Sequence, residues 1–148
     1  MVLIFLYILV KELAIKIPSS TEFVGPVVKF FYTLLAEKGF DDMVVANVTT
    51  AIVEALGNAI VHGNNSDVQK PIHISIRVHE NVMQIEVQDE GNGCDIESLP
   101  DPLAPENILK PCGRGIFLIK AFMDNVTFGK NGHGSKLIMH KAFERNIE

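Results

Sequence analysis

The chain has 148 residues, 47% hydrophobic and 21% charged, with a formal net charge of -5. This is the length of one domain, and the composition predicts a globular core and excludes general disorder, because enough apolar surface can be buried to offset the chain entropy. The acidic balance and the lack of a Lys/Arg cluster argue against nucleic acid as the main partner, since phosphate backbones require a basic surface. Cys94 and Cys112 match neither a disulfide framework nor a zinc pattern, so we expect free thiols in a reducing compartment.

The first ten residues are almost entirely apolar. Ten residues are too few to cross a bilayer, and no basic leader or small-residue cleavage site marks a signal peptide, so we expect no membrane association. We therefore predict an apolar N-terminal extension over residues 1–11 and a single domain over residues 12–148. Pairing of the extension with another strand or protomer, and a mis-assigned start codon, are both open alternatives.

Alternation and capping signals then predict the order strand, helix, helix, strand, strand, loop, helix, strand, strand. The predicted elements cover residues 12–17, 21–38, 43–62, 72–78, 83–87, 91–113, 116–123, 126–128 and 135–141. The first helix follows a Pro-Ser-Ser-Thr cap, and Asp41 or Asp42 caps the second. We expect an α+β two-layer sandwich with one mixed β-sheet and helices on one face.

The second helix carries an unusual polar stripe. At about 100° per residue, five side chains fall within about 120° of one another. They are Asn47, Thr50, Glu54, Asn58 and His62. A carboxylate can accept a proton and an amide oxygen can ligate Mg²⁺ without adding charge, so the stripe indicates a cavity for a metal and phosphate. The alternatives are a solvated helix face and, for His62 alone, a cation favoured near the helix C-terminus.

A first glycine segment, with Asp89, Gly91 and Gly93, directly follows the strand predicted over residues 83–87. The Asp89 carboxylate would lie at the end of that strand, where it can accept a hydrogen bond from an amino group. The two glycines would let the backbone approach a flat ligand. The alternative is a common turn.

A second glycine segment, Gly113-Arg114-Gly115, opens the helix predicted over residues 116–123. A helix N-terminus preceded by glycines presents free N–H groups and the positive end of the helix dipole, which together favour an anion. The alternative is a flexible loop that closes into an N-cap. A later segment that ends in Ser135 is compatible with a simple hairpin turn.

The order of these motifs resembles the GHKL ATPase superfamily, which has the Bergerat fold. Glu-Ala-Leu-Gly-Asn-Ala-Ile-Val-His-Gly at residues 54–63 is similar to the helix motif of the anti-sigma-factor serine kinases of bacterial stress and sporulation control. Gly-Arg-Gly-Ile-Phe-Leu-Ile at residues 113–119, followed by Met123-Asp124, is similar to their second glycine motif. The resemblance covers about residues 12–141.

The resemblance implies a role for each matched residue. Glu54 would be the general base that takes the proton from a partner's serine, and Asn58 would ligate the Mg²⁺ that bridges the ATP phosphates. Asp89 would bind the adenine amino group. The remaining nucleotide contacts would come from His62, Gly91, Gly93, Gly113, Gly115 and Ser135, beneath an ATP lid over residues 94–112. Ser135 departs from the usual threonine but retains the hydroxyl, and Arg114 would stabilise the transferring phosphoryl group or pair with the lid.

The resemblance also implies the activity and the partners. Length excludes the gyrase, mismatch-repair and chaperone members, which carry further domains, whereas an anti-sigma kinase needs only this one. The expected protein binds ATP and Mg²⁺ in the cytoplasm, phosphorylates a serine of a STAS-type anti-anti-sigma protein, and sequesters a sigma factor, commonly as a homodimer. The alternatives are a non-catalytic ATP-binding regulatory module and an orphan histidine-kinase catalytic domain acting in trans.

Overall fold

The structure is a computed structural model that describes residues 12–92, 104, 106, 114–131 and 134–144. The strands are β1 (Leu13–Pro18), β2 (Pro71–His79), β3 (Val82–Asp89), β4 (Asn125–Asn131) and β5 (Gly134–Ala142). The helices are α2 (Val24–Glu37), α3 (Asp42–Asn58) and α4 (Arg114–Phe122), with a 3-10 turn at Thr21–Phe23 and a π-helical turn at Ala59–Gly63. This is the element order expected from the sequence. The predicted extension and almost all of the predicted lid lie outside the described residues, so the domain limits stay a prediction.

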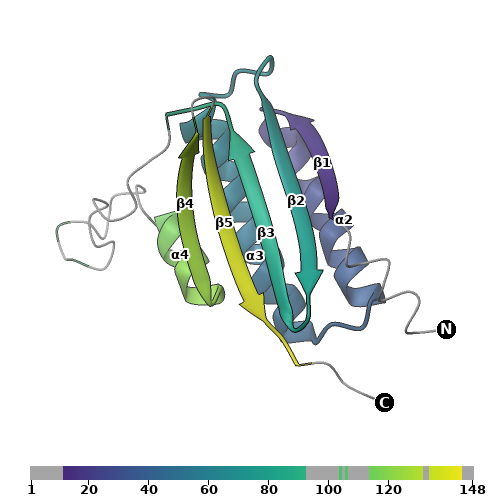
Figure 1. Cartoon of the computed structure of the whole chain (residues 1–148). Coiled ribbons are helices and arrows are strands. Elements are labelled where there is room, and N and C mark those ends of the chain that lie inside the picture. The colour runs from purple at the N-terminus through teal and green to yellow at the C-terminus, as the bar shows by residue number, and fades with distance from the viewer. Residues whose placement is uncertain (1–11, 93–103, 105, 107–113, 132–133, 145–148) are drawn as a thin grey trace.

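The strands form one sheet in the order β1-β2-β3-β5-β4. Each of its pairings, among the strands that the structure describes, is antiparallel. The expectation of a mixed sheet was therefore wrong. The physical reason is that β5 lies between β3 and β4 and starts at the end of the sheet where β3 finishes, so that Asp89 pairs with Ser135 in opposite strand directions (Figure 1).

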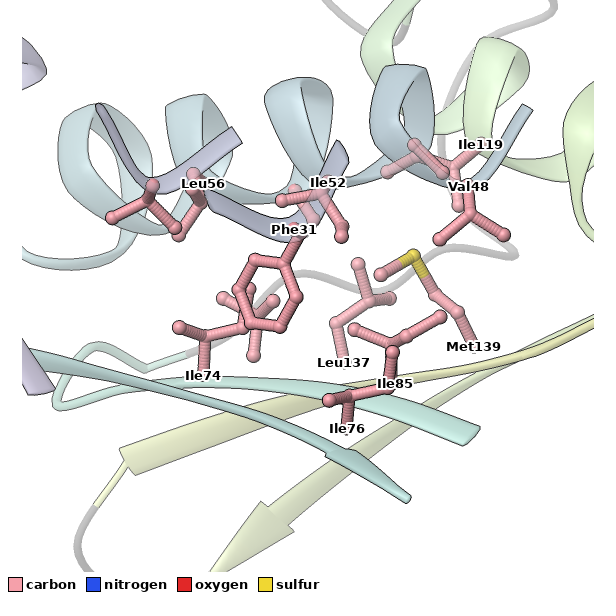
Figure 2. Close-up of a cluster of buried hydrophobic side chains, with 14 of the residues drawn as sticks. Phe31, Val48, Ile52, Leu56, Ile74, Ile76, Ile85, Ile119, Leu137 and Met139 are labelled. Atoms are coloured by element: carbon pink, nitrogen blue, oxygen red, sulfur yellow. The ribbon is translucent and has the colours of Figure 1, made fainter. Parts of the chain in front are cut away.

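The three helices pack on one face of this sheet, as expected for a two-layer α+β sandwich (Figure 1). Figure 2 shows the core between the layers, where Phe31 and Ile52 of the helices meet Ile74 and Ile85 of the strands. These four side chains are fully buried. The alternation of β2 and β3 explains the arrangement, because every second side chain points to the helices and the others remain on the open face.

The start of α2 differs from the prediction, whereas the end of α2 and the start of α3 agree with it. Ser20 makes no capping bond to the backbone; its hydroxyl donates to Glu22 instead, and a 3-10 turn precedes α2. At the other end, the N–H of Phe40 donates to the carbonyl of Leu35, which closes α2 as a glycine C-cap predicts. Asp41 caps α3 by accepting from the N–H of Met43 at 2.9 Å.

The segment Asp42–Gly63 is long and apolar enough, by length and composition, to cross a membrane, with a hydropathy of 1.6. Half of that window is buried inside the domain. α3 packs against both α2 and α4, so its position at the centre of the helical layer accounts for its apolar composition.

Candidate functional site

The end of α3 is wound more widely than an α-helix. In the π-helical turn Ala59–Gly63, the N–H of Asn64 donates to the carbonyl of Ala59, and that of Ser66 to the carbonyl of Ile60. A β-carbon at Gly63 would overlap the carboxylate of Asp89, and one at Gly91 would overlap the carbonyl of Gly63. The wide turn therefore brings the backbone after α3 into direct contact with the end of β3, and only residues without a side chain allow this approach.

The carboxylate of Asp89 lies at this contact and is 7% exposed. Its Oδ1 accepts the hydroxyl of Ser135 at 2.7 Å and the N–H of Gly91 at 2.7 Å. The β3–β5 register places Ser135 directly across from Asp89. Both hydrogen bonds that described residues donate to this carboxylate end on Oδ1.

A second group of side chains meets where α3 faces the start of α4. A β-carbon at Gly115, in the first turn of α4, would lie 2.9 Å from Oε2 of Glu54 and 3.3 Å from Oδ1 of Asn58. Glu54 and Asn58 are half-buried and one helical turn apart on α3. The polar stripe is therefore not a solvated face at these two positions, because it borders the N-terminus of another helix.

The two groups belong to one site. Gly63 follows Asn58 by five residues, or about 7.5 Å along a helix axis. Asp89 and Ser135 lie at the end of the sheet where β3 ends and β5 begins, and the π-helical turn carries the chain from the end of α3 to that end of the sheet. The site thus combines a carboxylate that can recognise an amino group with a carboxylate and an amide beside the N-terminus of α4.

These side chains are suited to Mg²⁺ held together with phosphate. Oε2 of Glu54 and Oδ1 of Asn58 lie 2.9 and 3.3 Å from the point that a β-carbon of Gly115 would occupy, so both oxygens border the first turn of α4. Mg²⁺ takes oxygen ligands and typically uses one or two protein groups, completing its shell with phosphate and water. The described residues contain no group of three or more His, Cys, Asp or Glu that could hold a metal by itself. A cation bound here would therefore depend on the nucleotide.

The remaining predicted site residues fall in three places. Gly93 and Gly113 lie outside the described residues. Arg114 is the first residue of α4, and its side chain is exposed. His62 is exposed in the π-helical turn. Within the stripe, the hydroxyl of Thr50 donates to the carbonyl of Ala46, so this hydrogen bond lies within α3.

Two residues that shape the site, Gly63 and Asn64, were not predicted from the sequence, and neither was the buried contact between Asn64 and Ser19. The second helix was predicted to end at residue 62, directly before Gly63 and Asn64; Gly63 was matched only as the last residue of the helix motif, and Ser19 only as part of a helix cap. Ser19 and Asn64 are fully buried. The one available signal was a glycine and an asparagine directly after the polar stripe, but nothing in the sequence locates the strand end that they contact.

Residues 17–141 match the family model of the histidine kinase-like ATPase domain. A serine-protein kinase RsbW of Oceanobacillus iheyensis is 29% identical over 132 residues, which cover 85% of this chain and 83% of that protein. An anti-sigma F factor of Clostridium perfringens is 33% identical over 102 residues, which cover 66% of this chain and 71% of that protein.

Two solved structures have the same fold. A crystal structure of the RsbU and RsbW domains of Rv1364c from Mycobacterium tuberculosis superposes with a TM-score of 0.68 at 19% identity, over 91% of this chain and 33% of that one. The catalytic domain of the histidine kinase ThkA gives 0.53 at 11% identity, over 88% of this chain and 96% of that one. At these identities the likeness concerns the fold alone, and it confirms the expected fold class.

Proposed function

The chain belongs to the histidine kinase-like ATPase family, and from this premise we propose that it is an anti-sigma factor that uses ATP to phosphorylate a serine of a STAS-type anti-anti-sigma protein. The observation that carries the proposal is the meeting of Glu54 and Asn58 with the start of α4 at Gly115. It places a proton acceptor and an amide oxygen beside N–H groups that favour phosphate. The relatives named for serine-protein kinase and anti-sigma activity support the same assignment.

We assign the nucleotide base to the end of β3. Oδ2 of Asp89 would accept the adenine amino group, while Ser135 and the N–H of Gly91 hold Oδ1. Gly91 and Gly93 would form the wall against which the flat base lies. The phosphates would then extend towards the N-terminus of α4, with the amides at Gly113 and Gly115 and the side chain of His62 near them.

The transfer step follows from this placement. The carboxylate of Glu54 takes the proton from the partner's serine, whose oxygen bonds to the γ-phosphorus as the bond to the bridging oxygen breaks and ADP leaves. Asn58 would hold Mg²⁺, which when bound neutralises phosphate charge. Arg114 can extend over the transferring phosphoryl group from the first turn of α4. Phosphoryl transfer depends mainly on such positioning and charge stabilisation.

The partners follow from the same proposal. The unphosphorylated STAS protein would compete with the sigma factor for the kinase. After the STAS protein is phosphorylated, the kinase would hold the sigma factor. We propose a homodimer in the cytoplasm that requires neither nucleic acid nor a membrane. The net charge of -5 agrees with the exclusion of nucleic acid.

Incubation of the purified chain with Mg²⁺, labelled ATP and a STAS protein encoded beside it tests the proposal. Label should reach the STAS protein, resist acid as phosphoserine does, and disappear when the acceptor serine is replaced by alanine. Acid-labile label would indicate phosphohistidine and a histidine-kinase role instead. ATP binding without transfer would favour a non-catalytic regulatory module.

A further inference from the structure

Asn64 is the most extensively bonded buried side chain near the site. It is fully buried, directly after Gly63. Its Nδ2 lies 2.9 Å from the hydroxyl of Ser19 and 3.2 Å from the carbonyls of both Lys70 and Pro71. Its Oδ1 accepts the N–H of Glu90 at 2.8 Å. One side chain thus joins the end of α3 to the segments that follow β1, precede β2 and follow β3.

The chemistry of these partners fixes the orientation of the amide. The carbonyls of Lys70 and Pro71 only accept hydrogen bonds, and the N–H of Glu90 only donates. The amide nitrogen must therefore face the two carbonyls, and the oxygen must face Glu90. An aspartate would place a negative oxygen against two carbonyls, and an apolar residue would leave buried groups unpaired.

The hydrogen bond to Glu90 holds the residue that directly follows Asp89. Asp89 is already held at Oδ1 by Ser135 and the N–H of Gly91. With the backbone of Glu90 held as well, rotation of the carboxylate is restricted, and within the described residues no hydrogen bond ends on Oδ2. The close approach of Gly63 to this carboxylate makes any movement of the neighbouring backbone change the shape of the pocket.

We propose that Asn64 is a positioning residue of the nucleotide site, which holds Asp89 in the orientation that selects the adenine amino group. The proposal deepens the proposed function and rests on it. It assigns base selectivity to a buried residue that does not itself contact the nucleotide. The role is one of geometry, so its loss should affect the recognition of the amino group more than the recognition of the phosphates.

The experiment compares dissociation constants for ATP and inosine triphosphate, which carries a carbonyl oxygen in place of the amino group. Asn64→Ala should weaken ATP binding about tenfold, as expected for one lost hydrogen bond, and leave inosine triphosphate nearly unchanged. In an Asp89→Asn background the same change should have little further effect, because coupled residues are not additive. Asn64→Ser has one shorter hydroxyl in place of the amide and cannot reach the carbonyls of Lys70 and Pro71 and the N–H of Glu90 at once. It provides a second variant if the alanine variant does not fold.

Ser19→Ala is the matched control. It removes the partner of Asn64 on the side away from Glu90, so it should lower the midpoint of urea unfolding without changing the preference for ATP. Equal losses for both nucleotides in the Asn64 variants, or an equal loss of preference in Ser19→Ala, would overturn the proposal and leave a merely structural role. Failure of the wild type to bind ATP would overturn the proposed function together with this inference.

Discussion

Two carboxylates of β3 lie on opposite faces of the sheet. Asp89 points to the helical side and accepts hydrogen bonds from Ser135 and Gly91. Glu86 lies on the open face, where it forms an ion pair with Lys136 at 3.2 Å. The strand is the same and the charge is the same, so the surroundings alone decide which carboxylate can recognise a ligand.

Asp89→Asn should therefore weaken ATP binding by about tenfold to a hundredfold, because the amide cannot keep both protein donors on one oxygen and still offer an acceptor to adenine. Isothermal titration calorimetry would measure the change. Glu86→Gln is the matched control on the same strand and should bind ATP as the wild type does. Equal affinity of the Asp89 variant would remove this residue from the base pocket.

Glu54 is expected to act on the transfer step alone. Glu54→Gln retains the size of the side chain but cannot accept the serine proton, so the transfer rate should fall about 10²- to 10⁴-fold while ATP affinity is retained. Single-turnover transfer and equilibrium ATP binding would separate the two quantities. Glu37→Gln, at an exposed position on α2, serves as the control. Transfer at the wild-type rate would show that the base had been wrongly assigned.

At the scale of elements, the site depends on how closely α4 approaches α3. Because a β-carbon at Gly115 would lie 2.9 Å from Glu54 Oε2 and 3.2 Å from Asn58 Nδ2, Gly115→Ala must displace one of these groups. A displacement of about 1 Å can lower a rate about a hundredfold, and the shift needed here is a few tenths of an ångström, so we expect a smaller loss of about two- to tenfold. The transfer rate should fall, although alanine favours the helix and thermal stability should be retained. A fall in stability with unchanged transfer would contradict this explanation.

Gly57 offers the opposite case within α3. A β-carbon there would meet nothing within 4 Å, so Gly57→Ala should raise the free energy of unfolding by about 0.5–1 kcal/mol through helix propensity alone. Transfer activity should not change. Chemical denaturation and the transfer assay would check both statements, and a loss of activity would mean that this face of α3 is used by a partner.

Elements with strong periodicity could be predicted from the sequence, whereas contacts between distant segments could not. The alternation of residues 72–78 and 83–87 predicted the neighbouring strands β2 and β3, and the polar stripe predicted Glu54 and Asn58 as site residues. The antiparallel sheet and the π-helical turn were missed, because strand order and local widening of a helix depend on tertiary contacts. Asn64 was interpreted as a helix end for the same reason: its partners follow β1 and β3, far away in the chain.

At the scale of the whole molecule, stability and function share one helix. α3 supplies Ile52 and Leu56 to the core and Glu54 and Asn58 to the site, so the packing of one face fixes the other. Ile52 is fully buried in the core (Figure 2). Its neighbour in the sequence, Val53, is 39% exposed. Substitutions at these two positions therefore distinguish the contribution of core packing to the free energy of unfolding from that of the helix itself.

Ile52→Ala should lower the free energy of unfolding by about 2–5 kcal/mol, because it removes apolar contacts and leaves a cavity between the helical layer and the sheet. Val53→Ala, a smaller change at an exposed position of the same turn, should cost about 0.5 kcal/mol. Urea denaturation of both variants would measure the difference. Since the sheet face of α3 fixes the site face, the Ile52 variant should also lose transfer activity at temperatures where it is still folded. If its activity per folded molecule equalled that of Val53→Ala, the core and the site would be mechanically independent.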